Sequence, residues 1–161
     1  MKLLNLTLLF WALIISVSGF AQEPKSETDG TSGIKALIDS KHFVFMAESA
    51  TPMRGGFRTL SPGYTLQVSG DTLTCDLPYY GRAYTAPINP AEAGMKFTSL
   101  KFDYTVKDKK KKGWTISIKT KDQVSTVQIN ISAFSNGSAS VYINSTDRQS
   151  ISYSGRIESK K

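Results

Sequence analysis

The chain has 161 residues, of which 20 are Lys or Arg and 13 are Asp or Glu, so its formal net charge is +7. This length suits one domain with a hydrophobic core of its own. Its single cysteine, Cys75, cannot form an intrachain disulfide, which excludes a small disulfide-stapled scaffold. The positive charge favours contact with anionic surfaces but does not by itself define a partner.

Residues 1–21 have the features of a secretory signal peptide. Lys2 precedes an apolar run from Leu6 to Val17, and small residues lead up to Gln22. The run is shorter than the about 20 apolar residues that a membrane-spanning helix needs. We therefore expect cleavage after Ala21, export to the periplasm or out of the cell, and no transmembrane span in the mature chain.

Residues 22–31, QEPKSETDGT, are polar and without periodicity, so they predict a flexible leader. The next segment, SGIKALIDSKH, places Ile34, Leu37 and Ile38 at helical spacing after Thr31 or Ser32, either of which can cap a helix. We expect one short helix here, at the start of a single β-barrel domain over residues 32–161.

From residue 43 onward, apolar residues recur at every second position. In KGWTISIKT, for example, Trp114, Ile116 and Ile118 alternate with polar neighbours, which places the apolar set on one face of a β-sheet. A break in the alternation between Phe97 and Leu100 suggests a β-bulge. Turn-forming residues separate about eight such strands, which we expect at 43–50, 62–69, 72–77, 95–106, 113–120, 123–132, 138–144 and 149–158.

The short connections between these strands predict an antiparallel meander. An open sheet of this size would expose two edges, and closure into a barrel removes them. We therefore predict an all-β fold, an up-and-down barrel with the short helix packed outside it or across one end. A two-layer β-sandwich is the alternative, because periodicity alone does not separate the two architectures.

One connection is long and unusual. The segment LPYYGRAYTAP, residues 77–87, lies between the strands expected at 72–77 and 95–106, where Pro78, Pro87 and Pro90 prevent regular strand pairing. Long loops within compact domains often carry function. The alternative is that the tyrosines cap one end of the barrel as part of its core.

Several segments together resemble a known family. LPYYGRAYTAP, GMKFTSLKFDYTV at 94–106 and STDRQSISYSGRIES at 145–159 occur in the order found in bacterial domain-of-unknown-function family 4251, and so do the earlier segments LIDSKHFVFMAESATP and LSPGYTLQVSGDTLTCDLPYYG. The resemblance covers about residues 34–158. It implies an exported, lipocalin-like β-barrel, and it implies no activity, because none is established for the family.

The residues for catalysis or metal binding are sparse. His42 and Cys75 are each the only residue of their type, whereas a zinc site needs about four ligands. Cys75 lies two residues from Leu73 and from Leu77, so it faces the same apolar side of the expected strand, and we expect a buried, inert thiol. Four aspartates fall in predicted turns, where side chains bond local backbone: Asp71, Asp108, Asp122 and Asp147. We predict a protein without enzymatic activity, metal or cofactor.

Two non-enzymatic functions fit the pattern. In the first, a small amphipathic or anionic, lipid-like ligand binds at the barrel mouth, where Arg82 anchors its acidic group and tyrosines cover its apolar part. The ligand-binding residues would be Tyr79, Tyr80, Arg82, Tyr84 and Arg148. In the second, large inward side chains fill the barrel, and the protein has a structural or interaction role in the cell envelope.

A run of lysines marks one predicted hairpin tip. Lys109, Lys110, Lys111 and Lys112 either form a solvated tip that discourages edge pairing or attract an anionic envelope surface such as lipid headgroups or polysaccharide. Nucleic acid is not an expected partner, because the chain is predicted to be exported and carries no recognition motif.

Overall fold

One antiparallel sheet accounts for most of the chain. The computed structural model describes residues 30–84, 94–109 and 113–160, so the predicted signal peptide and the leader up to residue 29 lie outside the described residues. The helix is α2 (Gly30–Asp39). The strands are β1 (His42–Pro52), β2 (Arg58–Thr59), β3 (Thr65–Ser69), β4 (Thr72–Leu77), β5 (Met95–Ser99), β6 (Phe102–Lys109), β7 (Gly113–Thr120), β8 (Val127–Phe134), β9 (Ser138–Ser145) and β10 (Arg148–Glu158).

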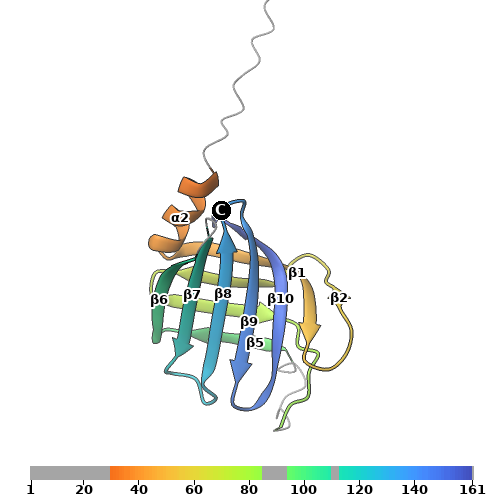
Figure 1. Cartoon of the computed structure of the whole chain (residues 1–161). Helices are drawn as coiled ribbons and strands as arrows, with labels where there is room; N and C mark the ends of the chain where they lie inside the picture. Colours follow the sequence, from red (N-terminus) through yellow and green to blue (C-terminus); the bar gives the residue numbers. More distant parts are fainter. Residues whose placement is uncertain (1–29, 85–93, 110–112, 161) are drawn as a thin grey trace, which may run out of the picture.

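The strand order is β5-β4-β3-β1-β10-β9-β8-β7-β6, and the two-residue strand β2 pairs with β1. The first and last long strands are therefore neighbours, with a ladder from Val44↔Glu158 to Pro52↔Ile151. In Figure 1, β6 to β10 stand upright in one layer, and β3, β4 and β5 cross behind them. The sheet curls on itself into a half-barrel, which confirms the all-β, antiparallel fold predicted from the sequence.

Strand β1 belongs to both layers because it bends. Its first half, His42 to Met46, pairs with β3, and its ladder with β10 shifts register between Ala47 and Ser49. Such a bulge bends a strand and increases its twist. Figure 1 shows β1 running behind the upright strands and then turning down beside β10.

The edge strands β5 and β6 follow one another in the chain, but they do not pair among the described residues. Only Leu100 and Lys101 separate them. The prediction of one strand over 95–106 with a bulge was wrong at this point, because the break in alternation marks a corner where the chain passes from one layer to the other. The corner leaves Leu100 65% exposed.

The carboxylate of Asp122, in the β7–β8 loop, fills this corner. It accepts hydrogen bonds from the Ser99 hydroxyl at 2.5 Å and from the backbone N–H groups of Leu100 at 2.7 Å and Lys101 at 3.2 Å. These donors, the Ser99 hydroxyl first, hold the pKa of Asp122 at about 2, below its ordinary 3.8. The expectation that Asp122 bonds only local backbone was therefore wrong, because its partners lie in another loop.

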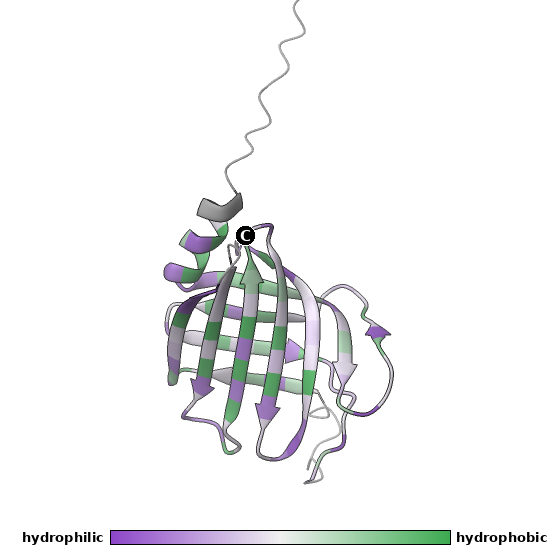
Figure 2. Ribbon diagram, in the orientation of Figure 1, coloured by the Kyte–Doolittle hydropathy of each residue, from purple (hydrophilic) through white to green (hydrophobic). Residues whose placement is uncertain are grey.

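Side chains fill the space between the two layers. Phe43, Phe45 and Tyr153 are fully buried, and they pack in one cluster with aliphatic residues from nearly every long strand. Figure 2 shows the alternation of apolar and polar residues along the upright strands. Four other aromatic residues are buried or pack at the margin of the cluster: Trp114, Tyr64, Phe102 and Tyr104.

Helix α2 lies at one end of the half-barrel (Figure 1), as predicted. It begins at Gly30, slightly before the expected start. Ile38 is fully buried, and its carbonyl accepts a hydrogen bond from the hydroxyl of Tyr104 at 2.9 Å. Burial, and secondarily the charge of Asp39, raises the pKa of this tyrosine. The helix is thus fixed to β6 as well as to β1.

Candidate functional site

The described part of the long connection docks against the start of β10. The N–H of Tyr84 donates to the carbonyl of Asp147 at 2.8 Å, and the N–H of Gln149 donates to the carbonyl of Arg82 at 3.0 Å. Ala83 and Arg148 form an antiparallel bridge. Residues 85–87 of the predicted loop lie outside the described residues. The structure thereby places Arg148 against the segment that carries Tyr79, Tyr80, Arg82 and Tyr84.

Two of these five residues face inward. The hydroxyl of Tyr79 lies 2.9 Å from the carbonyl oxygen of Gln149 and 3.0 Å from that of Arg82, and burial raises its pKa. The guanidinium of Arg148 stacks over the Tyr79 ring at 5.2 Å. Gly81 permits this fold, because a Cβ there would lie 2.3 Å from the Tyr79 hydroxyl oxygen. Tyr79 and Arg148 therefore hold the connection in place.

Arg148 is committed to partners of its own chain. Its Nη2 and Nε lie 2.8 and 3.1 Å from one carboxylate oxygen of Asp147, and its Nη1 donates to the carbonyl of Gly94 at 3.1 Å. Burial would raise the pKa of Asp147, but hydrogen bonds from Arg148 and the Ser145 hydroxyl outweigh it and keep the pKa low. The positive charge of Arg148 is thus neutralised inside the protein.

The start of the connection is fixed in the same way. The hydroxyl of Tyr153, a core residue on β10, donates to the carbonyl of Pro78 at 2.7 Å, and burial raises its pKa. Together with Tyr79 and Arg148, this contact supports the prediction that part of the segment caps the core. We name Tyr79, Asp147, Arg148 and Tyr153 the buried anchor.

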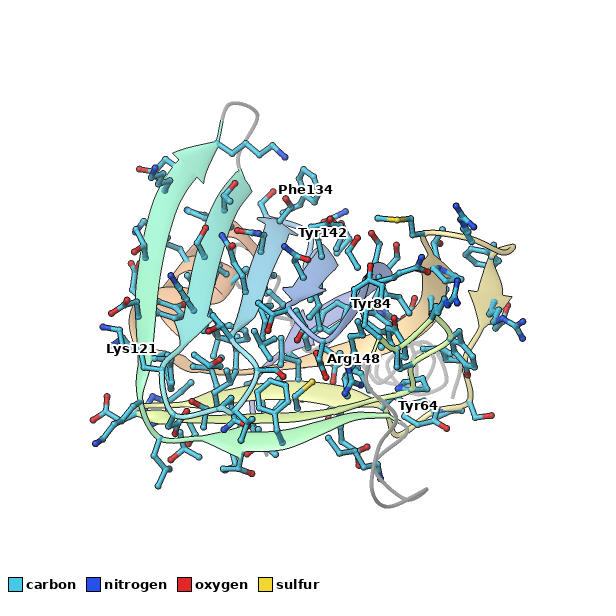
Figure 3. All side chains as sticks on the ribbon, turned by 90° about the horizontal axis from the view of Figure 1, so that it is seen from below. Tyr64, Tyr84, Lys121, Phe134, Tyr142 and Arg148 are labelled. Carbon is cyan, nitrogen blue, oxygen red and sulfur yellow. The ribbon has the colours of Figure 1, made fainter. Side chains whose placement is uncertain are left out.

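The other three predicted residues face solvent. Tyr80 is 38% and Tyr84 66% exposed, and Arg82 is exposed. The guanidinium of Arg58, on β2, stacks over the Tyr80 ring at 4.9 Å and adds a fourth residue that the sequence analysis missed. Figure 3 shows Tyr84 near Arg148 and away from Lys121. We name Arg58, Tyr80, Arg82 and Tyr84 the arginine–tyrosine surface.

Charge distinguishes this surface from the buried anchor. Among the described residues, neither Arg58 nor Arg82 lies within ion-pair distance of a carboxylate, and the same holds for the nearby Arg54. A planar guanidinium offers a fork of donors that matches a carboxylate or a phosphate. Within the part of the chain that the structure describes, the surface therefore combines two arginines that have no carboxylate partner with two exposed aromatic rings.

Three clefts on the outside of the described part of the molecule bear on the location of a site. One of about 310 Å³ lies beside Arg148, one of about 270 Å³ lies at the end of β1, and one of about 460 Å³ lies between α2 and the end of β10. None of the three is lined by Phe43, Phe45 or Tyr153. These clefts are therefore features of the surface and do not reach the centre of the half-barrel.

The expected inert thiol is in place. Cys75 is 2% exposed, and burial, followed by the charge of Asp76, raises the pKa of its thiol. Within residues 30–84, 94–109 and 113–160, no three His, Cys, Asp or Glu side chains gather as metal ligands would. In the same ranges, no helix has the length and hydropathy to cross a membrane.

The lysine-rich tip is described only in part. Lys109 is exposed at the end of β6, and its ammonium lies 5.7 Å from the centre of the Phe134 ring. Lys110, Lys111 and Lys112 lie outside the described residues. Attraction of this tip to an anionic surface therefore stays a prediction.

Comparison with known proteins agrees with the fold. The sequence matches the family described as "Domain of unknown function (DUF4251)" over residues 25–157. The crystal structure of a DUF4251 family protein from Bacteroides eggerthii is similar, with a TM-score of 0.60, 15% sequence identity, and coverage of 81% of this chain and 87% of that one. No curated protein matches the sequence.

Proposed function

We propose that this chain, which belongs to the DUF4251 family of domains of unknown function, is an exported binding protein without enzymatic activity. Its ligand is an anionic, amphipathic molecule that binds on the arginine–tyrosine surface. The observation that carries the proposal is the pair of exposed arginines, Arg58 and Arg82, which lack a carboxylate partner among the described residues; Arg58 stacks on Tyr80, and Arg82 lies two residues before the exposed Tyr84.

The chemistry of the surface favours such a ligand. A carboxylate or phosphate group can accept paired hydrogen bonds from a guanidinium, each worth about 1.5–3 kcal/mol when charge-assisted. The faces of Tyr80 and Tyr84 offer apolar area next to these donors. An acidic group and an apolar chain on one molecule would therefore both find partners here.

The packed interior supports an external site. Phe43, Phe45 and Tyr153 occupy the centre of the half-barrel, where a lipocalin-like ligand would lie. A filled interior was the second of the functions considered from the sequence, and the proposal combines it with ligand binding at the loop.

The test is isothermal titration calorimetry, in which the mature chain is titrated with dodecyl phosphate or dodecanoate. We expect saturable binding of both, because either headgroup can accept hydrogen bonds from Arg58 and Arg82. The double variant Arg58→Gln/Arg82→Gln should bind about tenfold more weakly or worse, since two charged donors are lost. Its free energy of unfolding should stay within about 0.5 kcal/mol of the wild type, because both residues are at the surface.

The matched control removes the same charge elsewhere. Lys101→Gln/Lys119→Gln lowers the net charge equally at two exposed positions of another region and should leave binding unchanged. If this control weakens binding as much as the arginine variant does, the attraction depends on net charge alone and the proposed site is wrong. Absence of saturable binding to the wild type would also overturn the proposal.

A second anionic contact is proposed at the lysine-rich tip. The support is the exposed Lys109 next to Phe134, at the end of a strand that leads into Lys110, Lys111 and Lys112. We expect the chain to sediment with vesicles that contain anionic lipid at low salt and to be released at high salt. Binding that does not respond to salt would contradict this contact.

A further inference from the structure

The cleft at the end of β1 differs in chemistry from the arginine–tyrosine surface, although Arg58 pairs with Ala50, the residue before Thr51 of the cleft. It has a volume of about 270 Å³ and is bounded by the ends of β1 and β10 and by the middle of β9. All of its lining residues are described: Thr51, Pro52, Met53, Tyr142, Ser150, Ile151 and Ser152. None of these residues carries a charge.

Three hydroxyl groups, those of Thr51, Ser150 and Ser152, line the cleft. None of the side-chain hydrogen bonds among the described residues involves Thr51, Ser150 or Ser152. Ser150 is 5% exposed, so this polar side chain is almost entirely buried, and what remains accessible opens to the cleft. Each of these hydroxyls can both donate and accept a hydrogen bond, so a ligand with the same capacity would find partners along this lining.

The position of Ser150 follows from an irregularity in the sheet. The ladder between β9 and β10 shifts register between Arg148 and Ile151, so Ser150 falls at a bulge. Bulges frequently re-aim a side chain, and they are common beside functional sites. Ser150 therefore does not follow the regular residue pairing between β9 and β10.

An aromatic ring borders the same cleft. Tyr142 is 44% exposed on the outer face of β9, and Met53 is 63% exposed on the other side of the cleft. Figure 3 labels Tyr142 on this outer face. The face of an aromatic ring carries partial negative charge, which attracts the weakly positive C–H groups of an apolar ligand surface.

We propose that this cleft binds a neutral sugar. A sugar ring offers hydroxyls that both donate and accept, which match Thr51, Ser150 and Ser152, and it offers a C–H face for Tyr142. The lack of charge in the lining disfavours an acidic or basic ligand. The volume lies just below the range of about 300–1,000 Å³ typical of drug-sized ligands, which suits a single ring.

The surface next to the cleft can extend this contact. Thr51, Ser152, Tyr142, Asn130 and Ser117 stand opposite one another in register across five neighbouring strands, from β1 to β7. With strands about 4.8 Å apart, this uncharged polar row reaches roughly 19 Å from the cleft side to β7. A linear oligosaccharide could follow it, so a trisaccharide should bind more tightly than its monosaccharide.

The test is an NMR titration of the isotope-labelled mature chain, in which the backbone amide chemical shifts are measured as a sugar is added. The probes are glucose, galactose, mannose and N-acetylglucosamine, each alone and as a linear trisaccharide. We expect at least one of them to shift the amides of Thr51, Tyr142, Ser150 and Ser152. Tyr142→Ala should weaken this binding by about tenfold, and Ser150→Ala by about fivefold.

Two controls keep the outcome clear. Tyr84→Ala removes an exposed tyrosine of the arginine–tyrosine surface and should leave sugar binding unchanged, so the test does not depend on the proposed function. If the trisaccharide binds more tightly than the monosaccharide, the polar row also contacts the ligand, and the ligand is a polymeric glycan. If the two affinities are equal, only the cleft binds, and the ligand is a free sugar. Failure of all probes to shift these amides, or undiminished binding by Tyr142→Ala, would overturn the proposal.

Discussion

Gly155 illustrates how closely two strands approach at the bend of β1. A Cβ at this position would lie 1.9 Å from the carbonyl oxygen of Met46 and 3.2 Å from the Cα of Ala47. Both are backbone atoms of the paired strand at its bulge, so they cannot move aside as a flexible side chain would. The absence of a side chain at Gly155 is therefore required for the β1–β10 pairing.

We predict that Gly155→Ala lowers the free energy of unfolding by about 3 kcal/mol, because the strands must separate to accept a methyl group. Urea denaturation measures the change. Gly56→Ala is the matched control, since a Cβ there meets no atom within 4 Å, and it should change stability by no more than about 0.5 kcal/mol. Equal effects of the two substitutions would show that the β1–β10 contact is looser than described.

Neighbouring residues of the long connection divide between two roles. Tyr79 points inward to the buried anchor, while Tyr80 stacks under Arg58 at the surface. The sequence predicted Tyr79 and Tyr80 as members of one site, since a run of aromatic residues in a proline-rich connection is a local signal, but it did not predict Arg58. It could not assign the roles, because they depend on contacts with β10 and β2 that are remote in sequence.

At the scale of elements, the corner between β5 and β6 depends on one carboxylate. Asp122 holds Ser99, Leu100 and Lys101 through hydrogen bonds to its charged form. Its pKa of about 2 in the folded chain lies below the ordinary 3.8, so the unfolded chain binds the proton more readily. The stability that this carboxylate contributes is therefore present above about pH 4 and is lost as the pH falls through about 2.

Asp122→Asn should accordingly be less stable than the wild type at pH 6, because an amide replaces the charged acceptor. The difference in Tm should shrink as the pH falls below about 4 and should be largely lost at about pH 2, where about half of the wild-type carboxyl is itself protonated. Thermal unfolding followed by circular dichroism across this range measures the gap. A gap that does not change with pH would show that the charge of Asp122 does not hold the corner. Asp71→Asn, in the β3–β4 turn, is the control for the same change of charge and side chain away from the corner.

Most elements could be predicted from the sequence, because strict alternation of apolar residues defines each strand locally. The corner between β5 and β6 could not be predicted in this way. Alternation breaks in the same way at a bulge and at a corner, and only the non-local partner of Leu100, the Asp122 carboxylate, separates the two. Strand β2 was missed for a similar reason, since Arg58 and Thr59 are too few to show a period.

At the scale of the whole molecule, the half-barrel is held together by its own packed centre. Phe45 on β1 is fully buried between the layers, and β1 is the strand that both layers share. We predict that Phe45→Ala lowers the free energy of unfolding by about 3–5 kcal/mol, because it leaves a cavity that the surrounding strands cannot fill. Phe57→Ala, at a residue 68% exposed, should change it by no more than about 0.5 kcal/mol.

Urea denaturation of both variants distinguishes a filled interior from an open one. If Phe45→Ala lowers the free energy of unfolding by less than about 1 kcal/mol, the interior is loosely packed and a ligand inside the half-barrel must be reconsidered. The sequence predicted the inward aromatic residues correctly, but their number alone could not establish whether they meet. That depends on how far the sheet curls, which is set by the bulge in β1 and the corner at Asp122.

The central claim is that the partner binds to the arginine–tyrosine surface and not inside the half-barrel. Native mass spectrometry of the chain purified gently from its own cell envelope, together with the Arg58→Gln/Arg82→Gln variant, tests it most directly. The account predicts a non-covalent acidic adduct on the wild type that the variant loses while remaining folded. An adduct that the variant retains, or a wild-type chain without any adduct, would contradict it.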